Sequence, residues 1–433
     1  MKTASLDARP VGDAGHGRPS PVRWWAAFTH RGYNCFQGAR FLSMLGMQMQ
    51  SVAVGWQVYA ITHRPIALAW VGLAQFFPAA GLSLITGQVA DRFDRRRIMM
   101  VCHAAMTALS LSLLLAAGAE TTHLASIYGL LVAIGVARAF LGPATQSILP
   151  SLVPLEHFGN AVTWASSLMQ TAMVLGPMVG GLVYAAAAGP AAVYGSAAAC
   201  STGALALVGA MGQSTAAAPA GSARVTERAS VLAGVRYVWS NPIVLGAISL
   251  DLFAVLLGGA TALLPIYARD ILHLGPSALG ALRSAPAAGA AVTGVLLALR
   301  PIEARAGAKM LGCVAVFGLA TIAFGLSSNL ALSLFALVIA GSTDMVSVVV
   351  RSALVQLATP PAMRGRVSAV NMVFIGASNE LGEFESGLTA QWLGAVSSVV
   401  LGGIGTLVVV AIWMRRFPQL RRVNRLTDVM PAS

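Results

Sequence analysis

The feature that most constrains this chain is a series of long apolar runs, each about the length that an α-helix needs to cross a bilayer. A spanning helix takes ~20 mostly apolar residues, and about twelve stretches of the 433 residues meet that length. A membrane β-barrel would instead show shorter segments of alternating hydrophobicity. We therefore predict an all-α integral membrane protein. Its predicted spans are 34–60, 66–90, 98–118, 124–149, 161–187, 191–211, 242–268, 277–299, 308–327, 330–357, 367–391 and 396–414.

The amino-acid composition predicts that little of the chain lies outside the bilayer. Hydrophobic residues make up 57% and charged residues only 10%, whereas a soluble domain carries about 25% charged residues. The net charge of +13 would suggest nucleic-acid binding in a soluble chain. Here the basic residues flank apolar runs, which is the pattern that fixes membrane orientation. We predict the lipid bilayer as a partner and no nucleic acid.

The distribution of basic residues predicts that both termini lie in the cytoplasm. With that orientation, 22 of the 28 Lys and Arg residues fall in cytoplasmic segments and four lie within spans. The outward loops hold only Arg64 and Arg269. Cytoplasmic loops of membrane proteins carry the excess of Lys and Arg, so the reverse orientation is disfavoured.

The longest break between spans, near residues 213–240, divides the chain into six spans plus six. Paired halves around a midplane site are a common plan of secondary transporters. The predicted organisation is a disordered cytoplasmic tail, a six-helix bundle, a cytoplasmic linker with a short amphipathic helix, a second six-helix bundle and a cytoplasmic tail. These parts take residues 1–33, 34–211, 212–240, 241–414 and 415–433.

A charged run between the second and third spans carries a family signature. It resembles the Gly-x-x-x-Asp-Arg-x-Gly-Arg-Arg loop of the major facilitator superfamily. The matching residues are Gly87, Asp91, Arg92, Arg95 and Arg96, with Asp94 in place of a Gly. The resemblance implies a conformational latch, in which Asp91 meets Arg364 or Arg366 at the start of span 367–391. The alternative is a positively charged anchor that only fixes topology.

Two further signatures lie within spans. Gly176, Pro177, Gly180 and Gly181 resemble the core of the superfamily's antiporter signature, in which Pro permits a helix bend and Gly lets another helix approach. The alternative is a packing interface alone. Arg138, followed by Gly142, resembles a signature of proton-coupled members. A mid-span Arg is costly unless it faces a cavity or a carboxylate, so we predict a functional role, with a structural ion pair as the alternative.

Acidic residues inside the spans are the candidate proton carriers. Those that we predict to serve proton coupling or the substrate cavity, together with Arg138 and Arg351, are Asp251, Asp344, Glu380 and Glu383. Glu380 and Glu383 are three residues apart and share a helix face, whereas Glu385 lies off that face. Burial and a neighbouring like charge both favour the neutral form of a carboxyl group. The alternative is internal pairing with Arg138, Arg283 or Arg351.

Three segments, 351–356, 364–371 and 378–383, strengthen the resemblance and narrow it to bacterial exporters of the enterobactin-exporter type. It implies the superfamily fold, with two pseudo-symmetric bundles of six helices. Motifs of other classes are missing from the sequence: there is no Walker-type phosphate loop, nucleophile elbow or His-Glu-x-x-His pattern. The four Cys form no Cys-x-x-Cys pair. We expect no enzyme activity, no cofactor and no metal.

These observations predict a monomeric secondary active transporter in the bacterial inner membrane. It would export a small amphipathic or hydrophobic solute, siderophore- or drug-like, by proton antiport with alternating access. One alternative is a proton-coupled importer of a metabolite. Another is a non-transporting membrane sensor or secretion accessory.

Overall fold

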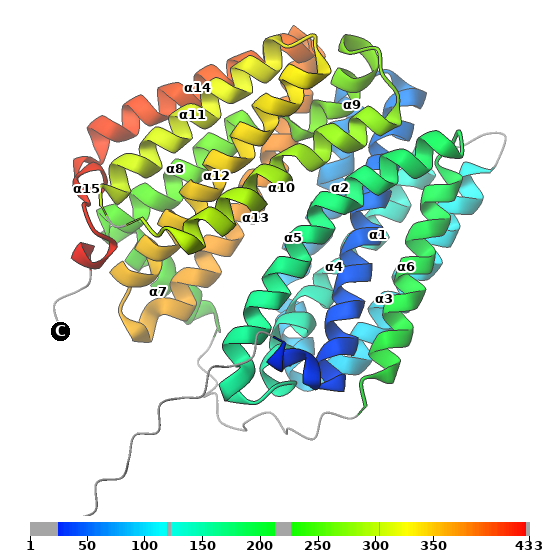
Figure 1. Ribbon diagram of the computed structural model, residues 1–433, viewed down its shortest axis with the longest axis horizontal. Helices are drawn as coiled ribbons and strands as arrows, with labels where there is room; N and C mark the ends of the chain where they lie inside the picture. The colour runs from blue at the N-terminus through cyan, green and yellow to red at the C-terminus, as the bar shows by residue number, and fades with distance from the viewer. Residues whose placement is uncertain (1–24, 119–122, 213–226, 303, 430–433) are drawn as a thin grey trace, which may run out of the picture.

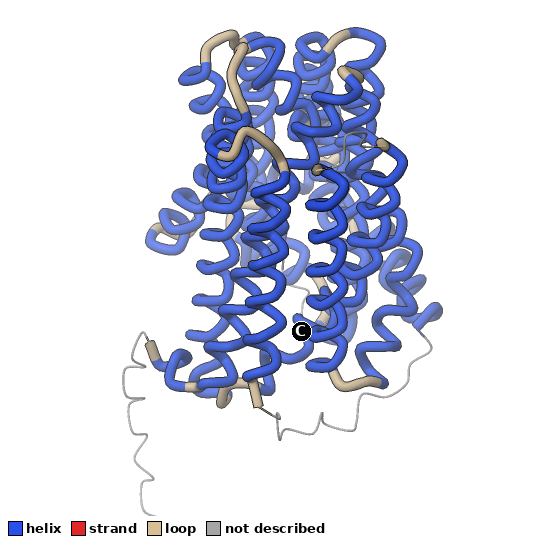
Figure 2. Tube along the Cα trace, turned by 90° about the vertical axis from the view of Figure 1, so that its right-hand side faces the viewer, coloured by secondary structure: helices blue, strands red, loops and turns tan. Residues whose placement is uncertain are grey.

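The computed structural model describes residues 25–118, 123–212, 227–302 and 304–429. Throughout these residues the chain forms helices joined by short loops, and no strand is found in them (Figure 2). The predicted all-α fold is confirmed. The predicted disordered N-terminal tail lies mostly outside the described residues.

The N-terminal bundle contains six long helices, blue to green in Figure 1. They are α1 (Arg31–Thr62), α2 (Pro65–Arg92), α3 (Arg95–Ala117), α4 (Leu124–Ile148), α5 (Leu155–Ala186) and α6 (Ala191–Ala210). A 3₁₀ turn, η1 (Ala26–Thr29), precedes α1, and η2 (Leu149–Ser151) follows α4. Buried small side chains such as Ala39, Ala144 and Ala204 let these helices pack closely.

The C-terminal bundle repeats this plan, green to red in Figure 1. Its helices are α8 (Pro242–Gly258), α10 (Pro276–Leu299), α11 (Ala306–Leu326), α12 (Leu330–Ala358), α13 (Arg364–Leu393) and α14 (Ala395–Arg416), followed by α15 (Pro418–Arg422). Local sequence fixes several helix starts: the side chains of Asn241 and Asn329 accept hydrogen bonds from the first backbone N–H groups of α8 and α12.

The predicted span 242–268 is interrupted. After α8 the chain continues as η3 (Ala260–Leu263), α9 (Leu264–Ile266) and the π-helical turn η4 (Tyr267–Ile271). The break falls at Gly258–Gly259, and Pro265 follows within α9. Glycine weakens a helix, and proline removes a backbone donor. The sequence signals for this break were present, but the continuous apolar run concealed them.

Ten helical stretches of the described chain are long and apolar enough to cross a membrane. Two other long helices, α1 and α13, of 32 and 30 residues, are more polar than these. Polar side chains explain the difference: α1 carries Arg40 and several Gln, and α13 carries Glu380, Glu383 and Glu385. Both helices carry polar groups to the place where the bundles meet: Gln48 and Gln50 from α1, and Glu380 and Glu383 from α13.

The bundles meet along two helix pairs, α5 with α10 and α2 with α13 (Figure 1). At the end that carries the α1–α2 turn, a β-carbon on Gly280 would lie 2.5 Å from the Pro177 carbonyl oxygen and 3.1 Å from Gly181 Cα. Close backbone approach of this kind requires glycine on both helices. Nearby, Tyr59 of α1 donates a short hydrogen bond to Asp270 of η4. Contacts between the bundles therefore tie this end together.

The opposite end carries the linker helix α7 (Glu227–Ser240). Val238 is buried against Val244, Val355 and Val367 of the C-terminal bundle. The Tyr237 hydroxyl donates to the Ala358 carbonyl at the end of α12. The short helix that the sequence predicts in the linker thus packs on the second bundle. The preceding linker residues 213–226 lie outside the described residues.

Candidate functional site

A polar cavity lies where the two bundles meet, and its charged lining comes from both of them. Arg138 of α4, with Gln75 of α2, lines it from the N-terminal bundle. The C-terminal bundle contributes Arg283 of α10 and the two acids Glu380 and Glu383 of α13. The structure therefore brings Arg138 together with Glu380 and Glu383, which lie more than 200 positions away in the sequence.

Glu380 and Glu383 extend from α13 across the seam to α2. A β-carbon on Gly72 would lie 3.0 Å from Glu383 Oε2 and 3.1 Å from Glu380 Oε2. A side chain at this position would press on both carboxylates. The two acids lie one helical turn apart on the same face of α13, as their spacing predicts.

Two guanidinium groups face these acids, one from each bundle. Arg138 and Arg283 both interact electrostatically with Glu380 and Glu383. Arg138 Nη1 donates a hydrogen bond of 2.9 Å to Gln75 Oε1. Although Arg138 lies near the middle of α4, its side chain is exposed, which indicates that it faces an open cavity and not packed protein. The site thus holds two positive and two negative side chains around an accessible space.

Asp344 lines a second cavity, inside the C-terminal bundle. This cavity also contacts Thr261 of η3, Thr321 of α11 and Asn379 of α13, and Glu383 borders it. Glu383 therefore lies between the central cavity and the one that holds Asp344. The break after α8 places η3 beside this space. Polar side chains continue from the seam into the second bundle.

Asp251 and Arg351 lie apart from both cavities. They form a direct ion pair between α8 and α12, with the Asp251 side chain 9% and the Arg351 side chain 3% exposed. Apolar neighbours such as Leu250, Ala254 and Val350 pack in the same region. Neither residue is among those that line the cavities described above. This geometry matches the internal pairing that the sequence left open as an alternative.

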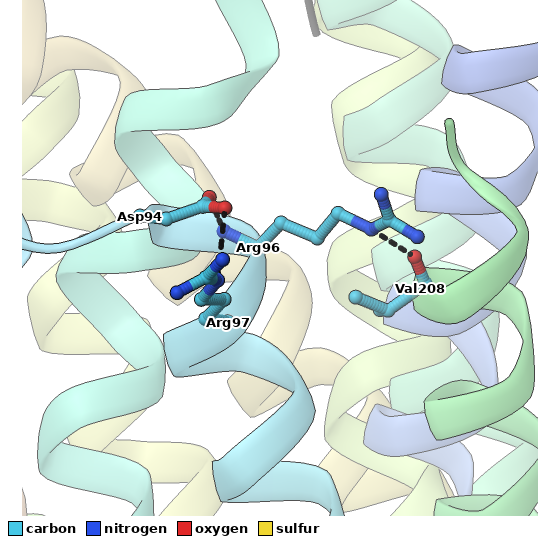
Figure 3. A network of polar contacts seen from close by, with 4 residues as sticks. All are labelled: Asp94, Arg96, Arg97 and Val208. Atoms are coloured by element: carbon cyan, nitrogen blue, oxygen red, sulfur yellow. Dashed lines mark hydrogen bonds and ion pairs between the residues drawn. The ribbon is translucent and has the colours of Figure 1, made fainter. Parts of the chain in front are cut away.

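The charged loop after α2 is held within its own bundle. The Asp94 side chain caps α3 by accepting a hydrogen bond of 2.9 Å from the Arg96 backbone N–H (Figure 3). The backbone of Asp94 has φ −60°, so the position does not require the Gly of the family pattern. Arg95 donates to the Ser147 carbonyl near the end of α4, and Arg96 donates to the Val208 carbonyl near the end of α6. Positive groups at helix C-termini are stabilising.

The other half of the predicted latch also contacts its own bundle. Arg364 Nε donates to the Thr359 carbonyl, and Arg366 packs its backbone against Gly234 of α7. The Asp91 side chain lies outside the described residues, Arg92 ends α2, and Gly87 has open space around it. The cross-bundle contact of Asp91 therefore stays a prediction.

The glycines of the α5 signature have two separate packing partners. Gly176 and Gly180 pack against Gln48 and Met49 of α1, inside the N-terminal bundle. Gly181 packs against Gly280 of α10, in the other bundle. Helix α5 is continuous across Pro177. The signature thus joins α5 to a neighbour on either side of the seam.

Arg283 and Gln75 were not among the predicted site residues. In the sequence, Arg283 stands only as a possible internal partner of the acids within the spans. In the structure it lies eight residues into α10 and lines the central cavity. That depth, roughly 10 Å at ~1.5 Å per residue, was a usable signal. Gln75 offered none, because a single uncharged residue in a span has many structural roles.

No group of three or more His, Cys, Asp or Glu side chains suited to a metal ion occurs in the described part of the chain. The charges at the centre of the molecule are instead arranged as facing carboxylates and guanidinium groups. Such groups can bind charged solutes and can gain or lose protons. The two bundles with polar residues at their shared seam define the class of a secondary membrane transporter.

Residues 22–430 match the family model described as transmembrane secretion effector. The chain belongs to this family of major facilitator superfamily transporters. It is 26% identical over 409 residues to the enterobactin exporter EntS of Escherichia coli strain SMS-3-5, with 94% of this chain and 96% of the relative covered. EntS of Shigella boydii serotype 18 matches equally in identity and coverage.

Solved transporter structures share the fold. A bacterial homologue of the human lysosomal transporter Spinster, crystallised facing inward and unoccupied, has a TM-score of 0.69 at 15% identity, covering 91% of this chain and 98% of its own. A D-xylose–proton symporter has a TM-score of 0.67 at 11% identity, covering 90% and 98%. The protein is thus a multi-pass transporter of the bacterial inner membrane, and its substrate is a small molecule.

Proposed function

We propose that this protein exports a small amphipathic or hydrophobic solute, siderophore- or drug-like, in exchange for protons. The observation that carries the proposal is the arrangement of Glu380 and Glu383 opposite Arg138 and Arg283. The carboxylates belong to one bundle, and Arg138 belongs to the other. Their charge state therefore acts directly on the contact between the two moving parts.

Protonation would weaken the attraction across the seam. When Glu380 and Glu383 are ionised, they attract Arg138 and draw the bundles together around the cavity. A proton on either acid removes part of that attraction. Carboxyl groups that line an accessible cavity at the seam can exchange protons with it. Proton uptake would then favour one orientation of the bundles and proton loss the other.

Two observations support loading from the cytoplasm. Gly181–Gly280 and Tyr59–Asp270 tie the bundles together at the α1–α2 end, which the arginine distribution assigns to the outside. The cavity of this conformation would therefore load from the linker end. The similarity to relatives named as exporters supports the same direction of transport. In this scheme Asp91, with Arg364 or Arg366, would latch the linker end in the alternate state.

The experiment is proton-driven transport in inverted membrane vesicles. Candidate fluorescent substrates are first chosen by testing the susceptibility of a deletion strain. They should accumulate in the vesicles, and this accumulation should stop when the proton gradient is dissipated. The double variant Glu380→Gln with Glu383→Gln should lose this accumulation by at least tenfold. Glu385→Gln is the matched control, because Glu385 lies on α13 but is not among the residues that line the two cavities. Accumulation that survives in the double variant would contradict the proposal.

Import is the competing function, and vesicle orientation separates the two. An exporter accumulates its solute in inverted vesicles, and a proton-coupled importer accumulates it in right-side-out vesicles. Asp91→Asn should reduce transport in either case if the latch operates. Unchanged transport in that variant would leave the charged loop with a structural role only.

A further inference from the structure

A second cavity of the N-terminal bundle, which shares Met47, Met106 and Arg138 with the central one, is rich in methionines. Five of them come from α1, α3 and α5: Met44, Met47, Met99, Met106 and Met169. Arg40, His103 and Arg138 lie in the same wall. Methionine is flexible and polarisable, and it forms surfaces that adapt to different apolar ligands.

Helical spacing explains why these residues converge. Arg40, Met44 and Met47 follow one another at intervals of four and three along α1, and Met99, His103 and Met106 do the same along α3. Residues at this spacing share one helix face. Each helix therefore presents a continuous mixed face of sulfur and nitrogen groups to the cavity.

Three side chains in this wall, Arg40, His103 and Arg138, are basic, and two of them have nitrogen atoms without a partner among the described residues. None of the residues that line the cavity in the described chain is acidic. The Arg40 guanidinium makes one long hydrogen bond, 3.4 Å from Nη1 to Gln37 Oε1, and its buried Nε has no partner among the residues that the structure describes. His103 is 1% exposed, and its Nδ1 likewise has no partner within those residues.

Unpaired buried polar atoms are costly, and native proteins rarely leave them without a partner or a ligand. A guanidinium group binds planar anions such as carboxylate or sulfonate with strong, directed hydrogen bonds. Arg40 and Arg138 provide two such groups in a single cavity, and His103 adds a third nitrogen function. The unsatisfied atoms thus belong to a site with the chemistry of an anion receptor.

We propose that this cavity binds an amphipathic anion, with the anionic group between Arg40 and Arg138 and the apolar body against the methionines. An amphipathic anion would then be the substrate class of the proposed function. That the bound anion is also transported rests on the proposed function; that it binds does not. Arg138 lines both this cavity and the central one. An anion on Arg138 would therefore compete directly with Glu380 and Glu383 for the same guanidinium charge.

The test is equilibrium binding to the purified full-length protein in detergent, with two probes that share an aromatic body. The probes are 2-naphthalenesulfonate and trimethyl(2-naphthyl)ammonium, measured by isothermal titration calorimetry. We expect the sulfonate to bind at least tenfold more tightly than the ammonium probe. Arg40→Gln and Arg138→Gln should each weaken sulfonate binding about tenfold, whereas Arg40→Lys should retain part of the affinity.

Arg300→Gln is the control, because Arg300 is an exposed arginine at the end of α10. It should bind the sulfonate as the unaltered protein does. Gel filtration and the thermal midpoint show whether each variant is folded. If Arg40→Gln does not fold, Arg40→Lys still tests the role of the guanidinium group. Equal affinity for the two probes, or sulfonate binding that the folded arginine variants leave unchanged, would overturn the inference.

Binding and transport can fail separately. If sulfonate binding depended on the arginines but transport did not depend on the proton gradient, the inference would be supported and proton exchange rejected. Proton-driven transport together with arginine-independent sulfonate binding would reject the inference and leave the proposed function standing.

Discussion

Two acid–arginine groups in the spans differ in almost every physical respect. Asp251 and Arg351 belong to one bundle, touch directly and are nearly inaccessible. Glu380 and Glu383 face Arg138 from the other bundle across an accessible cavity, and no ion pair closer than 4.0 Å joins them in the described residues. The first group is a closed internal ion pair that lines neither cavity. The second keeps its charges available to solute, water and protons, which is what a transport site requires.

The largest effect should follow from breaking the buried pair. Arg351→Ala leaves Asp251 charged and unpaired among apolar neighbours, so we expect the free energy of unfolding to fall by about 3–5 kcal/mol. Thermal unfolding in detergent would measure this. Replacing both residues, Asp251→Leu with Arg351→Met, should restore most of the stability, since apolar residues can replace a buried pair. If the double variant were as unstable as Arg351→Ala, the pair would have a role beyond mutual neutralisation.

The next effect concerns the glycine contact that holds the seam closed at the α1–α2 end. Gly280→Leu would insert a side chain where the Pro177 carbonyl and Gly181 already lie. Overpacking of this kind costs about 1–3 kcal/mol, so the bundles should separate there. Spin labels at residues 187 and 273 would report longer distances. Gly129→Leu, at a glycine with open space around it, should leave the distances unchanged.

Removing a charge from the seam should affect transport more than stability. Arg283→Gln takes away one of the two cations that face Glu380 and Glu383, and we expect proton-coupled transport to fall about tenfold, or about 1.4 kcal/mol in activation free energy. The thermal midpoint should change little, because the side chain borders a cavity. Arg300→Gln provides the exposed control. If Arg283→Gln failed to fold, Arg283 would have a structural role, like Arg351, and not a role in the transport site.

The smallest effect should come from the helix cap in the charged loop. Asp94→Ala removes the acceptor for the Arg96 backbone N–H, which costs about 1 kcal/mol. Asp94→Gly should cost only a few tenths of a kcal/mol, since glycine is tolerated at such caps. Thermal unfolding again provides the measurement. A transport defect in Asp94→Gly without a stability loss would assign the loop carboxylate a role in the conformational cycle.

The sequence predicts the fold because bilayer thickness sets helix length and because arginine placement follows orientation. The family signatures led correctly to the superfamily. Glu380 and Glu383 were predicted as a pair because three-residue spacing fixes a shared helix face. The sequence did not show that Asp251 has a different environment from these acids. That difference depends on which helices pack together, and helix packing is a property of the tertiary structure. Arg283 was not predicted as a site residue for the same reason: the sequence does not show which side chains of the neighbouring bundle lie beside it.

The break at Gly258–Gly259 has a mechanical consequence. The segment on one side of it carries Asp251, which is bound to Arg351 of the same bundle, and the segment on the other side carries Asp270, which is bound to Tyr59 of the opposite bundle. A straight rod would transmit any movement at Tyr59 to the buried pair. In the proposed transport cycle, a jointed span would let the Tyr59–Asp270 contact change while the Asp251–Arg351 pair stays in place.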